Sequence, residues 1–572
     1  MTEEHPVEKP IPQEELTAYA GRWVAVADGR VAGVGKTAMA AERLGRRNRV
    51  REKLHVYFVE KPGGELLNKP ELLERLAPVF MRHDQPVYLV GGSVRDLLLG
   101  RACKDLDFAV PERAIGLAFK VADHLKVPAY VLDRDRDTGR VLLPDEGMTL
   151  DFAGFRGDSL KADLGDRDFT VNAIALPVAA QSYSSLIDPC NGLQDLAKEL
   201  FRQTNKDAIS DDPVRAMRGL RLALQLGFSL ETATSTAIRA AGPFLKDVSC
   251  ERVRDELVIM LSGENPERAI QALNGHALLP FVLPEVADLQ GVEQSAPHRE
   301  AVLPHTISVL ASLHLVESVL LDGYKPDGPA MSQLLRQFGK YQGPLQEYFS
   351  RPVQGPVAAR LLLRLGAVFH DVGKPRSRTV VKDGRIRFLG HEKDGGQMAA
   401  RRLQQLHFSR QVVEQVRQIV EGHMWPLHLA KNETVSRRAT FRFFRRSGTA
   451  GLDIGLLSIA DYLATYGGLG DREKWTRLLE VIDQLYDHYF NHYDETVRPV
   501  PLIDGRELME TFDLDPGPEV GRLLRAIEEA QAAGEINSIV EATAFAGKAL
   551  KELPRLPETF NERLKNIDSR VE

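Results

Sequence analysis

The spacing of hydrophobic and polar residues divides the chain into an N-terminal part that contains strands and a long helical remainder. Residues 22–35 alternate around Asp28 and Gly29, a pair favoured in tight hairpin turns, and the apolar run 54–60 predicts a third strand. From Asn68 to about residue 195, helical and strand periods alternate, and beyond that point the helical period dominates. We therefore predict an α+β fold in which a small ββαβ appendage and a mixed head precede an all-α body.

A chain of 572 residues is too long for one hydrophobic core. Stretches containing proline and glycine at 283–297, 324–329 and 498–505 are expected to be joints between helical parts. The predicted division is an appendage at 1–66, a head at 67–200, a helical neck at 201–290, a helical domain at 291–475 and a helical tail at 476–572.

The composition favours an ordinary globular protein, with 43% hydrophobic and 27% charged residues. A net charge of -6 excludes a protein that is basic throughout, so any RNA contact must rest on local patches. Cys103, Cys190 and Cys250 are far apart and form no CxxC pair, which argues for a reducing compartment and against a zinc ribbon. With no signal-peptide pattern and no run of 18 apolar residues, we expect a cytoplasmic protein without a membrane partner.

A loop suited to phosphate binding follows the apolar strand at 88–90. Gly91 and Gly92 allow backbone amides to approach a phosphate closely, and Ser93 is expected to be a further donor. A double glycine alone is more often an ordinary turn, so the interpretation depends on what lies nearby.

Two carboxylates follow at strand spacing. Asp105 and Asp107 lie two residues apart in an apolar stretch, so both side chains project from one face of a strand and can hold divalent cations. Asp151 begins another strand and is the candidate third ligand, whereas the acidic run at 133–137 is typical of a turn. Beside the glycine loop, these carboxylates favour metal-assisted nucleotidyl transfer.

Two further segments suit a nucleotide. Arg167 and Asp168 precede an apolar segment and offer a cation for a triphosphate and an acceptor for ribose hydroxyls, although this is also a helix-capping pattern. Asp212, Arg215 and Arg218 recur at helical spacing. A carboxylate and a guanidinium three residues apart can read the edge of a nucleobase, or they can form an ordinary ion pair within a helix.

In order along the chain, GGSVRDLLLG, KDLDFAV, DFAGFR, RDFTVNAIA and DDPVRAMRGLRLA resemble the class II tRNA nucleotidyltransferase and bacterial poly(A) polymerase family over about residues 88–261. The resemblance implies a polymerase-β-like nucleotidyltransferase head with Mg²⁺ on Asp105 and Asp107, tRNA as partner, and CTP and ATP as substrates. It implies base reading by Asp212 and Arg215. The residues expected at the nucleotide are Gly91, Gly92, Ser93, Arg95, Arg167, Asp168, Asp212, Arg215 and Arg218.

Two departures from the family pattern matter. Asp166 stands where the family usually has a first arginine before Arg167, which puts one phosphate or sugar contact in doubt. Only ten residues separate Arg156 from Arg167, and the resemblance implies that a shortened segment accompanies addition of two cytidines rather than the whole CCA end. We expect CC addition ahead of CCA addition. A poly(A) polymerase, or a metal phosphohydrolase with an RNA-binding head, remains the alternative.

The helical body carries a second set of candidate metal ligands. Residues from several helices of a bundle can converge on one cation, although a single histidine on an apolar helix is more often a core residue. The order of these residues resembles HD-domain phosphohydrolases that hold two metals, which implies a divalent transition metal and phosphatase or cyclic phosphodiesterase activity. The expected ligands are His305, His370, Asp371, His391, His423 and Asp461. Three other histidines are expected to be structural or surface residues: His298, His314 and His428.

Two arginine-rich segments leave their role open. The run from Arg43 to Lys53 is expected to be a solvated helix face rather than an RNA contact. The segment 436–448 predicts a helix with Arg438, Arg442 and Arg445 on one side and phenylalanines on the other, which suits RNA docking and an ordinary amphipathic helix equally. The tail resembles C-terminal helices of longer family members, which implies tRNA contacts.

Overall fold

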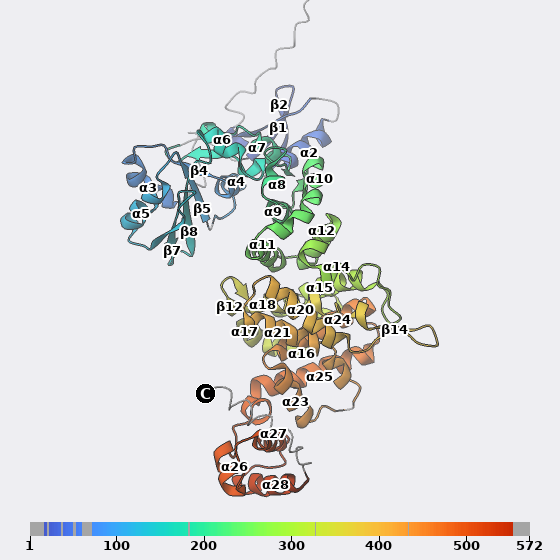
Figure 1. The fold of residues 1–572 in the computed structure, drawn as a ribbon. Coiled ribbons are helices and arrows are strands. Elements are labelled where there is room, and N and C mark those ends of the chain that lie inside the picture. Colours follow the sequence, from blue (N-terminus) through green and yellow to red (C-terminus); the bar gives the residue numbers. More distant parts are fainter. Residues whose placement is uncertain are drawn as a thin grey trace, which may run out of the picture. The chain divides into compact units, whose positions relative to one another are not determined.

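The chain is described by a computed structural model over residues 17–19, 22–35, 38–49, 53–59, 71–103, 105–180, 183–326, 328–432 and 434–552. It divides into two compact units, one of residues 1–256 with 275–278 and the other of residues 257–274 with 279–572. Figure 1 shows the larger sheets in the first unit and helices through the second. The predicted α+β class is confirmed, while the division into five segments remains a prediction.

The appendage is the predicted ββαβ unit. Its three antiparallel strands have the order β2-β1-β3, and the hairpin turns at Asp28 and Gly29, both with positive φ. The end of this unit, expected near residue 66, lies outside the described residues. The elements are β1 (Arg22–Ala27), β2 (Arg30–Gly35), α2 (Ala38–Asn48) and β3 (His55–Val59).

The head is built on a six-stranded sheet of order β6-β7-β8-β5-β4-β9, in which only β5 and β8 run parallel. Its strands are β4 (Tyr88–Val90), β5 (Asp105–Val110), β6 (Ala129–Asp133), β7 (Thr138–Leu143), β8 (Met148–Gly154) and β9 (Ala175–Pro177). Its helices are α3 (Glu71–Met81), α4 (Gly92–Leu98), α5 (Ala114–Leu125), α6 (Leu160–Gly165) and α7 (Gly192–Ala197).

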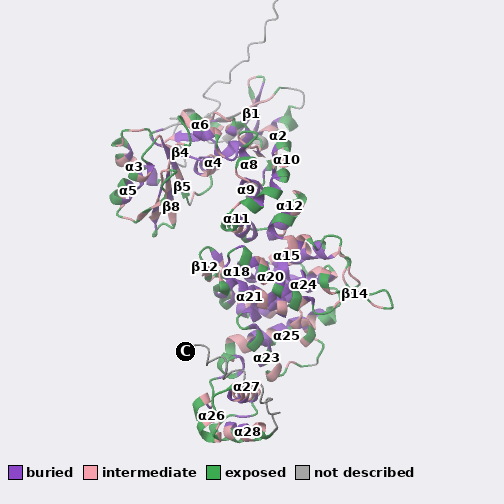
Figure 2. Cartoon of the chain, viewed as in Figure 1, coloured by how far each residue is buried: buried purple, intermediate pink, exposed green. Residues whose placement is uncertain are grey.

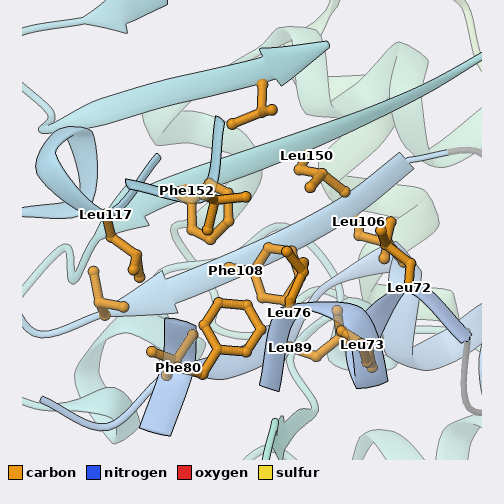
Figure 3. Packing of buried hydrophobic residues seen from close by; sticks show 14 of the residues in the cluster. Leu72, Leu73, Leu76, Phe80, Leu89, Leu106, Phe108, Leu117, Leu150 and Phe152 are labelled. Atoms are coloured by element: carbon orange, nitrogen blue, oxygen red, sulfur yellow. The ribbon is translucent and has the colours of Figure 1, made fainter. Parts of the chain in front are cut away.

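Alternation along β5 places its carboxylates. Figure 3 shows Leu106 and Phe108 of β5 packed among Phe152, Leu76 and Phe80, with the Phe108 and Phe152 rings stacked at 4.7 Å between centroids. Since successive side chains of a strand point to opposite faces, Asp105 and Asp107 project away from this core. The apolar packing therefore fixes the direction of the two acidic side chains.

The acidic run between β6 and β7 is a turn, as expected. The Asp133 carboxylate accepts hydrogen bonds from the amides of Asp135 and Arg136. The Asp137 carboxylate accepts the amides of Ala114 and Ile115 at the start of α5. These two carboxylates therefore form local hydrogen bonds to the backbone, as turn residues do, rather than binding a metal.

Short helices follow the head. They are α8 (Ala208–Asp211), α9 (Val214–Leu226), α10 (Thr232–Ala241), α11 (Cys250–Ser262), α12 (Pro266–Gly275), α13 (Leu279–Val282) and α14 (Pro284–Ala287). A two-stranded parallel pair, β10 (Leu200–Phe201) and β11 (Ser229–Leu230), joins the first of these helices to the head.

The helical body has its core where α15, α18, α21 and α24 pack together, the region of dense purple in Figure 2. Its helices are α15 (Val302–Leu320), α16 (Pro329–Phe338), α17 (Gln342–Ser350), α18 (Ala359–Phe369), α19 (Lys374–Ser377), α20 (His391–Gln405), α21 (Arg410–Gly422), α22 (Trp425–Leu429), α23 (Arg437–Ser447), α24 (Ala450–Tyr466) and α25 (Arg472–Asn491). Its hairpins are β12 (Pro352–Gln354) with β13 (Val357–Ala358), and β14 (Arg378–Val380) with β15 (Ile386–Phe388). Among the described helices, α15 alone is long and apolar enough to cross a membrane, and its buried residues belong to this core.

The tail packs its acidic helix on the arginine-rich helix α23. Its helices are α26 (Gly505–Phe512), α27 (Pro518–Ala532) and α28 (Ile539–Glu552). Arg438 lies 2.7 Å from Glu535 and 3.3 Å from Glu529, and Arg442 donates to Glu529 at 2.5 Å. The opposite face buries phenylalanines, as predicted. Since α27 covers the arginines, the structure favours an ordinary amphipathic helix over an RNA-docking face.

Candidate nucleotidyl transfer site and candidate metal centre

The turn between β4 and α4 brings the glycine loop against a carboxylate and a cation. Gly91 has φ 72°, a left-handed conformation that favours glycine. A Cβ at this position would lie 3.1 Å from a guanidinium nitrogen of Arg167 and 3.2 Å from a carboxylate oxygen of Asp107. Both the backbone conformation and the space therefore require glycine beside these two charged groups.

The two β5 carboxylates have different surroundings. Asp105 is exposed and accepts a 2.6 Å hydrogen bond from the Thr149 hydroxyl. Burial, together with the nearby Asp151 and Asp105 charges, raises the pKa of Asp107 to about 6, although the Arg167 charge opposes the rise. A carboxylate that is costly to ionise beside a second carboxylate fits a site completed by a cation.

Asp151 lies on the expected neighbouring strand, directly beside Asp107 in the parallel register. Both of its oxygens accept 2.6 Å hydrogen bonds from Arg140 of β7, a partner that the sequence did not indicate. A bidentate guanidinium already neutralises this carboxylate. Asp151 thus holds Arg140 beside Asp107, and its role as a third metal ligand stays a prediction.

Ser93 and Arg95 also have partners that the sequence did not indicate. The Ser93 hydroxyl donates to the Asp105 carbonyl at 3.2 Å and accepts the Asp107 amide at 2.9 Å, so it fixes β5 rather than offering a donor to phosphate. Arg95 binds Asp96 in a bidentate pair and donates to Asn172 at 2.6 Å. Gly92 lies beside the Arg95 guanidinium. The Ser93 and Arg95 side chains therefore stabilise the glycine loop through contacts within the protein.

Arg167 and Asp168 connect the loop to helix α9. The Arg167 guanidinium donates to Asp163 of α6 at 3.0 and 3.2 Å. The buried Asp168 carboxylate lies 3.5 Å from Arg218 of α9. Burial opposes ionisation of Asp168, yet Arg218 and the hydrogen bond from Asn172 hold its pKa below the usual range. Asp168 therefore stays charged and ties α9 to the head.

The expected base-reading residues Asp212 and Arg215 lie next to each other, and each also forms hydrogen bonds with other groups of the protein. Asp212 follows α8 and precedes α9, so it does not share one helix face with the arginines as predicted. Its carboxylate accepts a 2.6 Å hydrogen bond from Arg252 and lies 3.7 Å from Arg215. Arg215 also donates to the carbonyls of Asp166 and Ala208 at 3.1 Å. Arg215 is thus held by backbone next to the α6 segment.

In the helical body, the structure brings together all six expected HD ligands. Nε2 of His305 lies 3.0 Å from Asp461 and 3.9 Å from Asp371. Nε2 of His370 lies 3.1 Å from Asp371, and Nε2 of His391 lies 3.4 Å from it. His391 and His423 face each other with their Nε2 atoms 3.4 Å apart.

Backbone carbonyls orient three of these rings. Nδ1 of His370, His391 and His423 each donates a 2.7 Å hydrogen bond to the carbonyl three residues earlier, at Ala367, Phe388 and Val420. This arrangement fixes the tautomer and leaves Nε2 of each ring as the potential ligand.

The donor set fits two cations that share one carboxylate. Asp371 belongs to two triplets, one with His305 and His370 and one with His391 and His423, whose ligand atoms lie within 4.8 Å of one another. Burial lowers the pKa of His423 to about 3, so this ring is neutral and able to bind a metal. Nε2 of the buried His370 lies 3.1 Å from the Asp371 carboxylate without a well-aligned hydrogen bond to a described residue. Imidazole and carboxylate ligands suit a divalent transition metal.

Two residues at this centre were missed by sequence reasoning. His298, expected to be structural, lies edge-on to His305 at 4.8 Å between ring centroids and 3.4 Å from the Thr465 hydroxyl. Lys374 lies 2.7 Å from Asp371. Lys374 follows Asp371 by one helical turn, and this spacing could have indicated that the two side chains meet. No feature of the sequence around His298 indicated that it lies at the metal centre.

A cavity of about 900 Å³ opens over the metal centre. His391, His423 and Asp461 line one part of it, and Phe388 with Arg387 of the β14–β15 hairpin line another. An aromatic ring and cationic groups beside a candidate pair of metals suit a phosphate ester.

The fold and these two sites define an enzyme with a nucleotidyl transfer head and an HD-type metal-binding body. Family profiles agree with this class. They match the Poly A polymerase head domain at residues 87–202, a probable RNA- and SrmB-binding site of polymerase A at 227–289, and the HD domain at 331–466. The HD match begins after His305, although the structure brings that residue to the same centre. Residues 14–62 match a family of unknown function, DUF5678.

Curated relatives place the chain in a family. It is 33% identical over 476 residues to the A-adding tRNA nucleotidyltransferase of Deinococcus radiodurans, an alignment covering 82% of this chain and 96% of the relative. It is also 33% identical over 464 residues to the CC-adding tRNA nucleotidyltransferase of Thermus thermophilus, covering 80% and 92%. The chain belongs to the tRNA nucleotidyltransferase and poly(A) polymerase family and is a nucleotidyltransferase.

Solved structures share the fold. The apo form of a CCA-adding enzyme is 19% identical, with a TM-score of 0.54 over 84% of this chain and 93% of the other. A Thermotoga maritima CCA-adding enzyme complexed with tRNA is 19% identical, with a TM-score of 0.51 over 85% and 97%. The polymerase-like head followed by helical domains is therefore an established architecture.

Proposed function

We propose that this enzyme adds cytidine from CTP to the 3' end of tRNA and stops after two additions. The proposal rests on the contact between the Gly91 turn, Asp107 and Arg167, which joins a phosphate-approach loop to a carboxylate and a cation. Relatives of the chain that act on tRNA support the choice of RNA.

The head's residues suit in-line attack of the RNA 3'-hydroxyl on the α-phosphate. Mg²⁺ bound by Asp105 and Asp107 would supply the charge that neutralises the leaving pyrophosphate. Gly91 gives the triphosphate room at the backbone, and the free edge of the Arg167 guanidinium can bind its oxygens. Catalysis by this site is positioning and electrostatic stabilisation, without a covalent intermediate.

The segment between Arg156 and Arg167 supports the limit at two cytidines. Six of its ten residues form α6, which Ser159 caps and which buries Leu164 in the core beneath the sheet. Asp163 of this helix also accepts the Arg167 guanidinium. A short, packed helix in this position cannot sweep over the base pocket as a long loop can, and pocket rearrangement is one way to change nucleotide choice.

We also propose that the helical body hydrolyses phosphate esters at RNA ends, with phosphate monoesters and cyclic phosphodiesters as the substrate class. Asp371, Asp461 and the four histidines would hold the metals, which would supply an activated water. Lys374 and Arg387 lie in the same cavity and can orient the phosphate. This activity would prepare a 3' end for nucleotide addition.

One assay set tests the transfer proposal. The enzyme is offered tRNAs that end at the discriminator base, at C, or at CC, with labelled CTP or ATP given separately. The expected result is two cytidines on the first tRNA, one on the second and none on the third. Adenosine addition to the CC tRNA would contradict the limit, and long A tails on unrelated RNA would identify a poly(A) polymerase.

The hydrolase proposal has its own assay. Bis-p-nitrophenyl phosphate and a 2',3'-cyclic nucleotide are incubated with enzyme reconstituted with Mn²⁺, Co²⁺ or Ni²⁺. We expect the unaltered enzyme to hydrolyse these substrates. His370→Gln should abolish this hydrolysis and leave cytidine addition intact. Equal hydrolysis by the variant and the unaltered enzyme would refute the assignment of the centre.

A further inference from the structure

Helix α2 of the appendage is seated on its sheet by close backbone contact. A Cβ at Gly33 of β2 would collide with the backbone of α2 at Ala41 and Gly45. A Cβ at Gly45 would lie 2.8 Å from Cβ of Ala25 on β1, and Asn48 donates to the Ala32 carbonyl at 2.8 Å. Glycine on both surfaces thus fixes which face of α2 is turned toward the strands.

The opposite face of α2 is an arginine surface, consisting of Arg43, Arg46 and Arg47. Their spacing of three and four residues places them side by side on the helix, and all three are exposed. Glu42 lies 3.6 Å from Arg46 in an exposed pair, which is a weak interaction. Within the described residues, no ion pair involves Arg43 or Arg47.

The charge of this segment departs from that of the whole chain. Residues 38–53 contain six basic and two acidic residues, whereas the chain has a net charge of -6. The arginines of α23 provide a contrast, because each of Arg438, Arg442 and Arg445 has a glutamate of the tail within 3.5 Å. Exposed arginines on a rigid support, in a chain otherwise acidic, form a surface complementary to a polyanion.

We propose that the arginine surface of α2 binds phosphates of the tRNA that the head extends, and this inference rests on the proposed transfer function. Guanidinium groups match phosphate geometry and remain charged at any physiological pH. The appendage belongs to the same compact unit as the head, where α2 packs near α7. The appendage therefore adds affinity for the RNA backbone without taking part in chemistry.

The test compares two full-length variants with equal loss of charge. One carries Arg43→Gln, Arg46→Gln and Arg47→Gln. The control carries Arg378→Gln, Lys382→Gln and Arg385→Gln on the β14–β15 hairpin, whose three side chains are also exposed. Fluorescence anisotropy measures the Kd for labelled tRNA between 50 and 200 mM KCl, and steady-state assays measure KM for tRNA and CTP.

The first variant should raise the tRNA Kd roughly tenfold, and the slope of log Kd against log salt should fall by about 2 for three lost contacts. KM for CTP and kcat should not change. A variant with lysine at all three positions should retain most of the salt slope, because it keeps the charges. An unchanged slope, or an equal loss in the hairpin control, would overturn the proposal.

The binding assay separates this inference from the proposed function. If the unaltered protein binds tRNA through α2 but adds no cytidine, the transfer proposal fails and the arginine surface stands. If cytidine addition proceeds with the same tRNA Kd in all variants, the surface is rejected and the transfer proposal stands. Circular dichroism on each variant confirms that the exposed substitutions leave the fold intact.

Discussion

Replacing Asp107 with asparagine should stabilise the metal-free protein while abolishing nucleotide transfer. Burial raises the pKa of Asp107 to about 6 from an ordinary 3.8. Below about pH 4 the side chain is protonated in both folded and unfolded chains. As the pH rises, the unfolded carboxyl ionises first, so the folded state loses relative stability until the pH passes about 6. Asparagine carries no such penalty.

The size of the effect follows from the two pKa values. Their difference corresponds to about 3 kcal/mol at neutral pH. Asp107 retains some solvent access, and screening reduces this to about 1.5 kcal/mol. For a unit of roughly 250 residues, that change should raise the Tm by about 3 to 6 °C.

Differential scanning calorimetry in EDTA, at pH 8 and pH 4, measures the difference between Asp107→Asn and the unaltered protein. The higher Tm should be present at pH 8 and be several times smaller at pH 4, where the unfolded carboxyl is only partly ionised. Asp151→Asn is the matched control, because it removes a neighbouring carboxylate that Arg140 already binds, and it should lower the Tm at pH 8. The reasoning is wrong if Asp107→Asn lowers the pH 8 Tm as the control does.

Three further outcomes are expected. His370→Gln should reduce the metal bound per chain, measured by mass spectrometry after dialysis against Mn²⁺, and leave cytidine addition within twofold. Arg364→Met should destabilise the second unit by roughly 3 to 5 kcal/mol in urea unfolding, because it leaves the buried Glu317 with Arg360 alone and removes the donor to two backbone carbonyls. Glu529→Lys should speed proteolytic release of the tail by repelling Arg442, whereas an unchanged cleavage rate would show that the pairing adds nothing.

The sequence predicted the architecture because the decisive signals are local. Alternation places Asp105 and Asp107 on one face, and the core under Leu106 and Phe108 then fixes which face that is. The HD ligands were predicted from the resemblance to HD-domain phosphohydrolases rather than from periodicity, since His370, Asp371 and His423 lie in turns just after α18 and α21. On β5, the periodicity that forms the strand also orients the functional side chains.

Partners set by tertiary register could not be predicted. Nothing in the sequence indicated that Arg140 would bind Asp151, because the pairing depends on how β7 and β8 align. The partner of the buried Ser93 hydroxyl could not be predicted either, because a strand backbone and a phosphate can both form hydrogen bonds with a hydroxyl. His298 reaches the metal centre only through the path of a connection between helices.

The two arginine segments show where such reasoning stops. Both α2 and α23 present arginines at helical spacing, and charge pattern alone identifies a polar face without identifying what meets it. The partner of α23 lies about ninety residues further along the chain, where α27 places Glu528 and Glu529 against these arginines. On α2, Arg43 and Arg47 form no ion pair with any described residue. The same composition therefore stabilises a domain contact in one place and leaves a surface for a polyanion in the other.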